Sequence, residues 1–220
     1  MMKEKIFLFL LLYSCTLPGY SQINNNNLLK KKGKIIILFD GRNLNKWEGN
    51  KSLWQIKGNE LVAGDTAVEQ PENDFLSTKK NYRNYILKLK FKLEGTVGWV
   101  NSGVQLHSQR NKVPPLYEMS GFQAEIASGC WGCIYDESRR NDYLAIADQK
   151  IVEKVLNKGD WNDYEIRCMD RRIVILLNGL QTVDYAERAN EYPAFGKIAL
   201  QIHSKGFTKI SFRDIILEQF

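Results

Sequence analysis

Residues 101–108 read N-S-G-V-Q-L-H-S, and the chain continues after Pro114-Pro115 with G-F-Q-A-E-I at residues 121–126. Apolar and polar side chains alternate in both segments, as in β-strands whose two faces meet different surroundings. A third segment, A-L-Q-I-H at residues 199–203, alternates in the same way. We therefore predict three strands that each turn one face to a hydrophobic core and the other to a shared polar surface.

The two predicted faces differ in the kind of side chain that they carry. The core face is expected to hold Ser102, Val104, Leu106, Phe122, Ala124, Ile126, Leu200 and Ile202. The polar face is expected to hold Gln105, His107, Gln123, Glu125, Gln201 and His203. Amides, imidazoles and a carboxylate can orient hydroxyl groups and transfer protons, which favours a binding or catalytic surface. The alternative is an ordinary solvent-facing sheet, whose residues also alternate.

The N-terminus has the pattern of an export signal. Two lysines precede the apolar residues 6–13, and small residues lead up to Ser21. Such an order of basic, apolar and small residues is typical of secretory signal peptides. We therefore predict a signal peptide at residues 1–21, a flexible leader at residues 22–33, and a periplasmic or secreted protein.

A lipid anchor on Cys15 is the minor alternative, because the bulky Tyr13 fits the lipoprotein pattern poorly. No transmembrane segment is expected after signal cleavage.

Residues 34–220 suit a single domain with one hydrophobic core. The formal net charge is +6, but the cations of this domain are interleaved with acids, so no nucleic acid partner is expected. The sequence leaves the oligomeric state open.

Short alternating segments separated by turn residues extend through the whole domain. Besides the segments quoted above, strands are expected at residues 35–39, 54–57, 60–63, 75–78, 85–93, 164–169, 173–177, 180–183 and 210–217. Helical periodicity is limited to residues 145–156. Many short strands with turn signals between them indicate two packed antiparallel sheets. The predicted fold class is therefore all-β.

Outside the expected signal peptide the chain has three cysteines, of which Cys130 and Cys133 form a C-W-G-C motif. A redox dithiol requires its first cysteine at a helix N-terminus in a thioredoxin-like unit, whereas this motif lies between two predicted strands. A zinc site requires a second ligand pair, and the sequence shows none. A short-range disulfide and a pair of inert thiols are both compatible with the motif.

Several motifs in a fixed order carry a resemblance to a known family. They are L-F-D-G-R-N-L-N-K-W (38–47), W-Q-I-K-G-N-E-L (54–61), F-L-S-T-K-K-N-Y (75–82), N-S-G-V-Q (101–105), G-D-W-N-D-Y-E-I (159–166), L-N-G (177–179), I-A-L-Q-I-H (198–203) and F-R-D-I (212–215). Together they resemble the 3-keto-disaccharide hydrolase domain family over residues 38–217. The resemblance implies a concanavalin A-like jelly-roll sandwich, secreted or periplasmic, with a glycan site on its concave sheet.

One motif departs from the family pattern. Many relatives read Y-E-x-Q where this chain has F-Q-A-E at residues 122–125, so amide and carboxylate exchange places at Gln123 and Glu125. Both positions stay on the predicted polar face, two residues apart. The departure therefore concerns the assignment of acid and base rather than the fold.

The scarcity of carboxylates on the polar face indicates the kind of reaction. An ordinary glycosidase uses two facing carboxyl groups, and Glu125 is the one that the alternation places there; Glu118, Asp136 and Glu137 are assigned to flanking loops. A 3-keto sugar offers another route, because its ketone acidifies the hydrogen on C2. One base then removes this proton, the leaving group is expelled by elimination, and water adds afterwards.

We therefore expect a hydrolase that cleaves 3-keto-glycosides or ordinary glycosides. Glu125 and His203 are expected to transfer protons, and Arg139 to stabilise the anion or anchor the substrate. The expected substrate contacts are Gln105, His107, Gln123, Gln201, Asn101, Tyr135, Trp99 and Trp131. No spacing demands a cofactor, although the Glu and His side chains are compatible with a divalent metal ion. The alternative function is a non-catalytic, lectin-like carbohydrate-binding module, because concanavalin A-like folds also bind glycans without cutting them.

Overall fold

The computed structural model describes residues 32–112 and 116–220. The expected signal peptide, Cys15 and nearly all of the expected leader lie outside the described residues, so these assignments stay sequence-based predictions. Within the described residues, no helix is long and apolar enough to cross a membrane.

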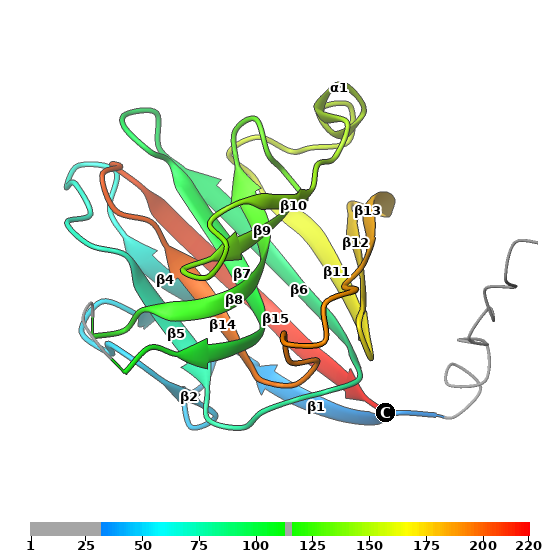
Figure 1. The fold of residues 1–220 in the computed structure, drawn as a ribbon. Coiled ribbons are helices and arrows are strands. Elements are labelled where there is room, and N and C mark those ends of the chain that lie inside the picture. Colours follow the sequence, from blue (N-terminus) through cyan, green and yellow to red (C-terminus); the bar gives the residue numbers. More distant parts are fainter. Residues whose placement is uncertain (1–31, 113–115) are drawn as a thin grey trace, which may run out of the picture.

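Two antiparallel β-sheets pack as separate layers (Figure 1). Sheet A consists, in spatial order, of β13 (Leu180–Ala186), β12 (Arg172–Leu177), β11 (Asn162–Met169), β6 (Tyr85–Glu94), β15 (Lys209–Gln219), β4 (Glu60–Gly64) and β3 (Gln55–Lys57), with β1 (Lys34–Phe39) paired to β15. Sheet B consists of β10 (Tyr143–Ala145), β9 (Ile134–Glu137), β8 (Met119–Ala127), β7 (Asn101–Arg110), β14 (Lys197–Ile202), β5 (Asp74–Thr78) and β2 (Trp47–Glu48). A short helix, α1 (Gln149–Val152), lies within the segment of predicted helical periodicity. The predicted all-β jelly-roll sandwich is confirmed.

A continuous apolar core fills the space between the two sheets. The residues that the alternation predicts for it are buried there from the side of sheet B: Val104, Leu106, Phe122, Ala124, Ile126, Leu200 and Ile202. Sheet A contributes, among others, the alternate residues of β6 from Tyr85 to Leu93. Because neighbouring strand residues point to opposite sides, the polar residues of these strands lie on the outer face of sheet B, which is turned away from sheet A.

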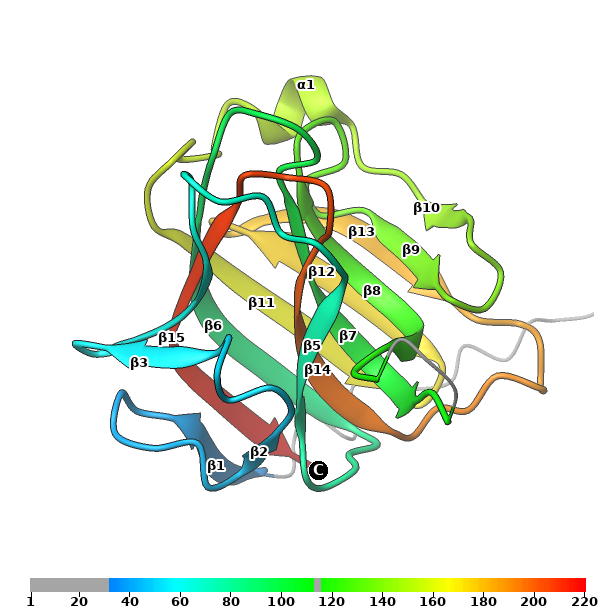
Figure 2. The same ribbon diagram turned by 90° about the vertical axis from the view of Figure 1, so that its left-hand side faces the viewer.

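The far end of the β7–β8 hairpin folds back over this outer face. Figure 2 shows β8, β7, β14 and β5 as neighbours within one layer. Met119, near the hairpin end, packs on Phe75 and Ala199 in a small cluster separate from the main core. Arg110 pairs with Met119 and donates to Ser77 Oγ on β5 at 2.8 Å, so it reaches across β14. The hairpin end therefore covers the part of the outer face formed by Phe75, Ser77 and Ala199.

Candidate active site

Four of the predicted polar residues form a buried strip on the outer face of sheet B. Gln105 lies on β7, Gln123 and Glu125 lie on β8, and Gln201 lies on β14. Glu125 is 3% exposed, and the three amides are exposed by 1% or less. Burial of so many polar groups is favourable only where they are hydrogen-bonded. The contacts within the strip therefore decide what it can do.

A chain of hydrogen bonds runs along the strip in one direction. The Ser108 hydroxyl group donates to Gln105 Oε1, and Gln105 Nε2 donates to Gln123 Oε1 at 2.8 Å. Gln123 Nε2 then donates to Glu125 Oε1 at 2.9 Å. Because an amide oxygen can only accept, these bonds fix the orientation of both amides. The NH₂ group of Gln123 is consequently aimed at the Glu125 carboxyl group.

Glu137 joins this strip as a second carboxyl group. Gln123 pairs with Tyr135 across β8 and β9, so the alternation places Glu137 on the same outer face. Gln123 Nε2 lies 3.3 Å from Glu137 Oε2, and Gln201 Nε2 lies 3.4 Å from the same oxygen. The Gln123 amide therefore bridges Glu125 and Glu137. The prediction that Glu137 lies in a flanking loop is wrong, because β9 extends to this residue.

Both carboxyl groups bind their protons more tightly than an ordinary glutamate does. Burial raises the pKa of Glu125 to about 8, and the neighbouring Glu137 adds to the rise. Burial also raises the pKa of Glu137 to about 7. The cations of sheet B are engaged elsewhere, for instance Arg139 with Asp136. Two coupled carboxyl groups of this kind retain a proton between them at neutral pH.

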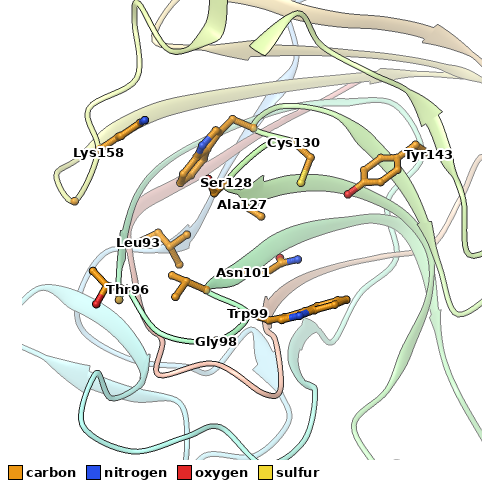
Figure 3. A pocket seen from close by; sticks show the side chains of 14 residues that line it. Leu93, Thr96, Gly98, Trp99, Asn101, Ala127, Ser128, Cys130, Tyr143 and Lys158 are labelled. Atoms are coloured by element: carbon orange, nitrogen blue, oxygen red, sulfur yellow. The ribbon is translucent and has the colours of Figure 1, made fainter. Parts of the chain in front are cut away.

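A pocket of about 650 Å³ opens beside Glu125 at the loop end of the sandwich (Figure 3). Asn101 lines this pocket, and its side chain lies close enough to Glu125 to lower the pKa of that carboxyl group. Cys130 lines it too, and its Sγ lies 3.9 Å from Glu125 Oε2. Tyr143, on the edge strand β10, lies close enough to the Cys130 thiol to affect its pKa, and Figure 3 shows the two groups pointing toward each other. Asn101 and Cys130 thus form a thin wall between the pocket and Glu125.

His203 is tied to the same wall. Its backbone N–H donates to Asn101 O at 3.2 Å, and its Nδ1 lies 2.7 Å from Ser204 O. A carbonyl oxygen can only accept, so Nδ1 carries the hydrogen and Nε2 is the acceptor nitrogen. Burial lowers the pKa of His203. The ring is therefore neutral at neutral pH, and Nε2 can take a proton.

Trp99 is exposed yet firmly held at the mouth of the pocket. Its side chain is 64% exposed, and its ring stacks on His203 with the centroids 5.2 Å apart. Its backbone N–H donates to Lys205 O at 2.8 Å, and its carbonyl accepts from Thr208 Oγ1 at 3.4 Å. An exposed aromatic ring on a fixed backbone is a platform for a flat ligand face.

Trp131 and Tyr135, two further predicted contacts, differ in their surroundings. The Trp131 ring is stacked on Phe91 in the core at 6.2 Å, and the residue also lines the pocket. Tyr135 lies on the outer face and meets Tyr143 edge-on at 5.1 Å. Trp131 therefore supplies a rigid pocket wall, whereas Tyr135 lies beside the two carboxyl groups.

His107 does not share the polar face, contrary to the prediction. The β7–β8 register shifts after Leu106, and His107 has a left-handed backbone with φ of 50°. This β-bulge directs the ring to Tyr85, which it meets edge-on at 5.5 Å, and to Arg83 O, to which Nε2 donates at 2.7 Å. Burial lowers the pKa of His107 to about 4. His107 is thus a core residue, and Ser108 takes its place on the polar strip.

The structure does not bring Arg139 to the polar strip either. Arg139 Nη2 lies 2.7 Å from Asp136 Oδ1, and Asp136 pairs with Phe122 on the core side of β9 rather than lying in a loop as predicted. The guanidinium group lies over the rings of Phe122 and Tyr192. These contacts explain the position of Arg139 as packing at the edge of sheet B.

The C-W-G-C motif contains free thiols in this structure. Cys130, Cys133 and Cys168 are all buried and unbridged. Burial raises the pKa of Cys130 and of Cys168 to about 12. Thiols with such pKa values react poorly at neutral pH, which agrees with the inert pair that the spacing allows.

Within residues 32–112 and 116–220, no three side chains of His, Cys, Asp or Glu are grouped so as to hold a metal ion. The divalent metal with which the sequence is compatible therefore has no evident set of ligands in the described part of the chain.

Solved structures share this fold at low sequence identity. A proposed glycosyl hydrolase from Parabacteroides distasonis ATCC 8503 aligns with a TM-score of 0.63 and 19% identity over 84% of this chain and 94% of its own. The carbohydrate-binding module CBM66 from Bacillus subtilis aligns with a TM-score of 0.57 and 10% identity over 79% and 96%. A Bacillus subtilis protein of unknown function with a galectin-like fold aligns with a TM-score of 0.61 and 12% identity over 86% and 97%.

No curated protein sequence matches the chain. A family model, by contrast, covers nearly the whole described fold: the model for 3-keto-alpha-glucoside-1,2-lyase-like domains matches residues 34–218. This is the family that the ordered motifs indicate, and the match extends from β1 to β15. The chain therefore belongs to the family of 3-keto-alpha-glucoside-1,2-lyase-like domains.

Proposed function

We propose that this protein cleaves 3-keto-glycosides by elimination, with water adding afterwards to complete hydrolysis. The observation that carries the proposal is the pair of carboxyl groups, Glu125 and Glu137, bridged by the Gln123 amide beside a pocket. Carboxyl groups with pKa values raised toward neutrality are typical of residues that transfer protons. Elimination across C1 and C2 is also the reaction class for which the family is named.

The reaction needs one base and one acid. The C3 ketone acidifies the hydrogen on C2, so the base can remove it as a proton and leave an enolate. The electron pair then forms a C1–C2 double bond while the bond from C1 to the leaving oxygen breaks. The acid protonates this departing oxygen. Addition of water across the double bond gives the free 3-keto sugar.

Glu125 and His203 supply the acid and the base in this proposal. Glu125, with a pKa of about 8, keeps its proton at neutral pH and acts as the acid. His203 is neutral and acts as the base through Nε2. Asn101 lies beside both groups, because its backbone carbonyl accepts from the His203 backbone N–H and its side chain is near the Glu125 carboxyl group. Glu137 keeps Glu125 protonated through its negative charge.

The pocket wall contains a hydrogen-bond acceptor that lacks a partner. Asn101 lines the pocket, and its Oδ1, buried in this structure, accepts no hydrogen bond from the described residues. A hydroxyl group that donates to it would remove the cost of an unsatisfied polar atom. The exposed Trp99 ring adds a stacking surface at the same mouth. Both features suit a sugar ring.

Two further observations agree with this proposal. Solved structures of the same fold include a proposed glycosyl hydrolase and a carbohydrate-binding module, which supports a carbohydrate ligand. The basic, apolar and small residues of 1–21 support a location in the periplasm or outside the cell.

A solvent-exchange assay tests the proposed reaction. Wild-type protein in D₂O receives a 3-keto-disaccharide or the corresponding ordinary disaccharide, with and without added divalent metal, and NMR follows the products. The proposal predicts monosaccharide release and deuterium at C2 for the keto substrate alone.

Glu125→Gln and His203→Asn should each lower kcat about a hundredfold or more. The control Glu165→Gln, on sheet A, should leave kcat unchanged. Turnover unaffected by Glu125→Gln would overturn the assignment of the acid.

Carbohydrate binding without cleavage is the second candidate function. It is favoured by the burial of Glu125, which is 3% exposed and lies behind Asn101 and Cys130. The exposed Trp99 platform would serve a binding module equally well. Glycan binding by the wild-type protein without turnover of either disaccharide, whatever the metal added, would select this function.

A further inference from the structure

We infer that the pocket beside Glu125 receives the leaving group and takes a flat, apolar, uncharged one, so that the substrates are 3-keto-glycosides of aromatic alcohols. This inference rests on the proposed function, since that function supplies the bond to be broken. It adds the chemical class of the part of the substrate that departs.

Apolar side chains form much of the pocket wall. Leu93 and Ala127 are buried beneath it, Val100 is half-buried, and the Trp131 ring stands beside them. Because Trp131 is stacked on Phe91, its ring is held in place. A hexose carries hydroxyl groups all round, and burying them against such a wall without partners is unfavourable. An aromatic ring is stabilised by the same burial.

The lining of the pocket is effectively uncharged. Lys158 is the charged residue among the residues that line it. Its Nζ lies 3.2 Å from Glu153 Oε1, so the positive charge already has a partner at the surface. An anionic leaving group would therefore gain little from Lys158. The lining favours a neutral ligand.

Figure 3 shows two sides of the pocket. Cys130 and Tyr143 lie at one side with Asn101, in front of the proposed acid, whereas Leu93 lies toward the other side with Thr96 and Lys158. A sugar ring beside Asn101 directs the leaving group along the pocket toward Leu93. The volume of about 650 Å³ is in the range of pockets that hold a drug-sized ligand. It accommodates a sugar and an aromatic ring together.

Two substrates isolate the effect of the pocket, because benzyl alcohol is a weaker acid than a sugar hydroxyl group and is therefore not the better leaving group. One is the 3-keto derivative of benzyl glucoside, and the other is the 3-keto derivative of a glucosyl-glucose disaccharide. We expect kcat/KM for the benzyl substrate to be about tenfold higher or more, chiefly through a lower KM. An equal or lower kcat/KM would overturn the inference while the proposed function stands.

Turnover of neither substrate would overturn the proposed function, and calorimetry then decides the inference separately. Unoxidised benzyl glucoside should bind about tenfold more tightly than the unoxidised disaccharide. Equal or weaker binding of the benzyl compound would overturn the inference in that case as well.

Substitutions in the lining locate the preference in this pocket. Ser128 lines the pocket and is exposed, so Ser128→Asp adds a carboxylate without burying it in the core. It should lower the ratio of the two kcat/KM values roughly fivefold or more, and the exposed Ser52→Asp should not. Val100→Thr keeps the shape, adds a hydroxyl group and should act in the same direction, with the exposed Val97→Thr as its control. A ratio unchanged in both pocket variants would overturn the inference.

Discussion

Asp136 and Glu137 are neighbours on β9, yet their carboxyl groups meet opposite surroundings. Asp136 is fully buried on the core side and contacts both Arg139 and Arg140. Glu137 lies on the outer face, where the charges of Glu118 and Asp136 raise its pKa and its own charge raises the pKa of Glu125. Burial alone therefore does not decide what a carboxyl group does. A carboxyl group that is paired with guanidinium groups stabilises the packing. A carboxyl group beside a second one retains a proton that can be transferred.

The arginine side of β9 continues into a wider network. Arg140 Nη2 lies 2.6 Å from Glu187 Oε2, and the Tyr185 hydroxyl group donates to the same oxygen at 2.8 Å. The Arg140 guanidinium group also lies over the rings of Phe122 and Tyr192. The network links the edge of sheet B to the segment that follows β13. Asp136 therefore stabilises the packing of this edge, whereas Glu137 does not take part in it.

Asp136→Asn should have the largest effect on stability. It removes the shared partner of Arg139 and Arg140, which are both largely buried, and should cost about 3 to 5 kcal/mol in the free energy of unfolding. Urea denaturation measures this loss. The control Asp184→Asn breaks a half-exposed pair with Arg172 and should cost less than about 1 kcal/mol. Similar losses of unfolding free energy in Asp136→Asn and Asp184→Asn would show that the network does not stabilise the edge of sheet B.

Most of the fold was predictable because its strands obey one simple rule. Val104, Leu106 and Phe122 alternate with polar residues, and burial follows this alternation. The rule fails at His107, where a β-bulge shifts the register. No residue in the segment 101–108 predicts this local change of the backbone. The alternation itself would have located Glu137 had the short strand β9 been recognised.

The site was predictable in its composition but not in its contacts. Gln105, Gln123, Gln201 and Glu125 lie together as the alternation predicts. The burial of these residues depends on packing between segments that are distant in the sequence, which a single sequence does not reveal. The packing of Arg139 likewise depends on the rings of Phe122 and Tyr192, which are distant from it in the sequence. For this reason, the sequence alone indicates Arg139 as a site residue.

The stability of the wild-type protein should fall as the pH rises from about 5 to about 8, because the contributions of Glu125 and Glu137 outweigh the smaller opposite contribution of His107. The folded pKa values of Glu125 and Glu137, about 8 and about 7, exceed the ordinary value of 4.5, so the folded state binds more protons than the unfolded state between these values. Their stabilising contribution is complete below the ordinary pKa and is lost as the pH rises through 7 to 8.

Glu125→Gln should therefore flatten this pH dependence. The difference in the free energy of unfolding between the variant and the wild type should change by on the order of 2 to 4 kcal/mol between about pH 5 and pH 9. Denaturation at each pH measures this change. Part of the slope should remain, because burial also raises the pKa of Glu137, Glu118 and Asp74. The control Glu165→Gln should keep the wild-type slope, and the same slope in Glu125→Gln would contradict the account.

Gln123→Met should have a smaller effect that touches both carboxyl groups. It removes the N–H donor to Glu125 and Glu137 and the acceptor of Gln105, at a cost of about 1 to 2 kcal/mol. Since that donor lowers both pKa values, the pH–rate profile should shift to higher pH. The exposed Gln181→Met is the matched control. A profile that stays in place would show that the bridge does not couple the two groups.

The two histidines should give the smallest contrast in stability and a clear one in activity. His107→Asn should cost about 1 kcal/mol of stability and leave kcat of the folded protein nearly unchanged, because the ring packs on Tyr85 in the core. His203→Asn should do the reverse, keeping stability and losing turnover. Thermal denaturation and kcat, measured on the same preparations, separate the two outcomes. Loss of kcat in well-folded His107→Asn would reverse the assignment.

A ¹³C NMR titration of the glutamate side-chain carboxyl groups tests most directly whether Glu125 and Glu137 hold a proton between them at neutral pH. The account predicts two glutamates that titrate at about pH 7 to 8, and Glu137→Gln should lower the pKa of Glu125 because it removes a neighbouring negative charge. Titration of every glutamate below about pH 5 would contradict the account, because both carboxyl groups would then be ordinary anions at neutral pH.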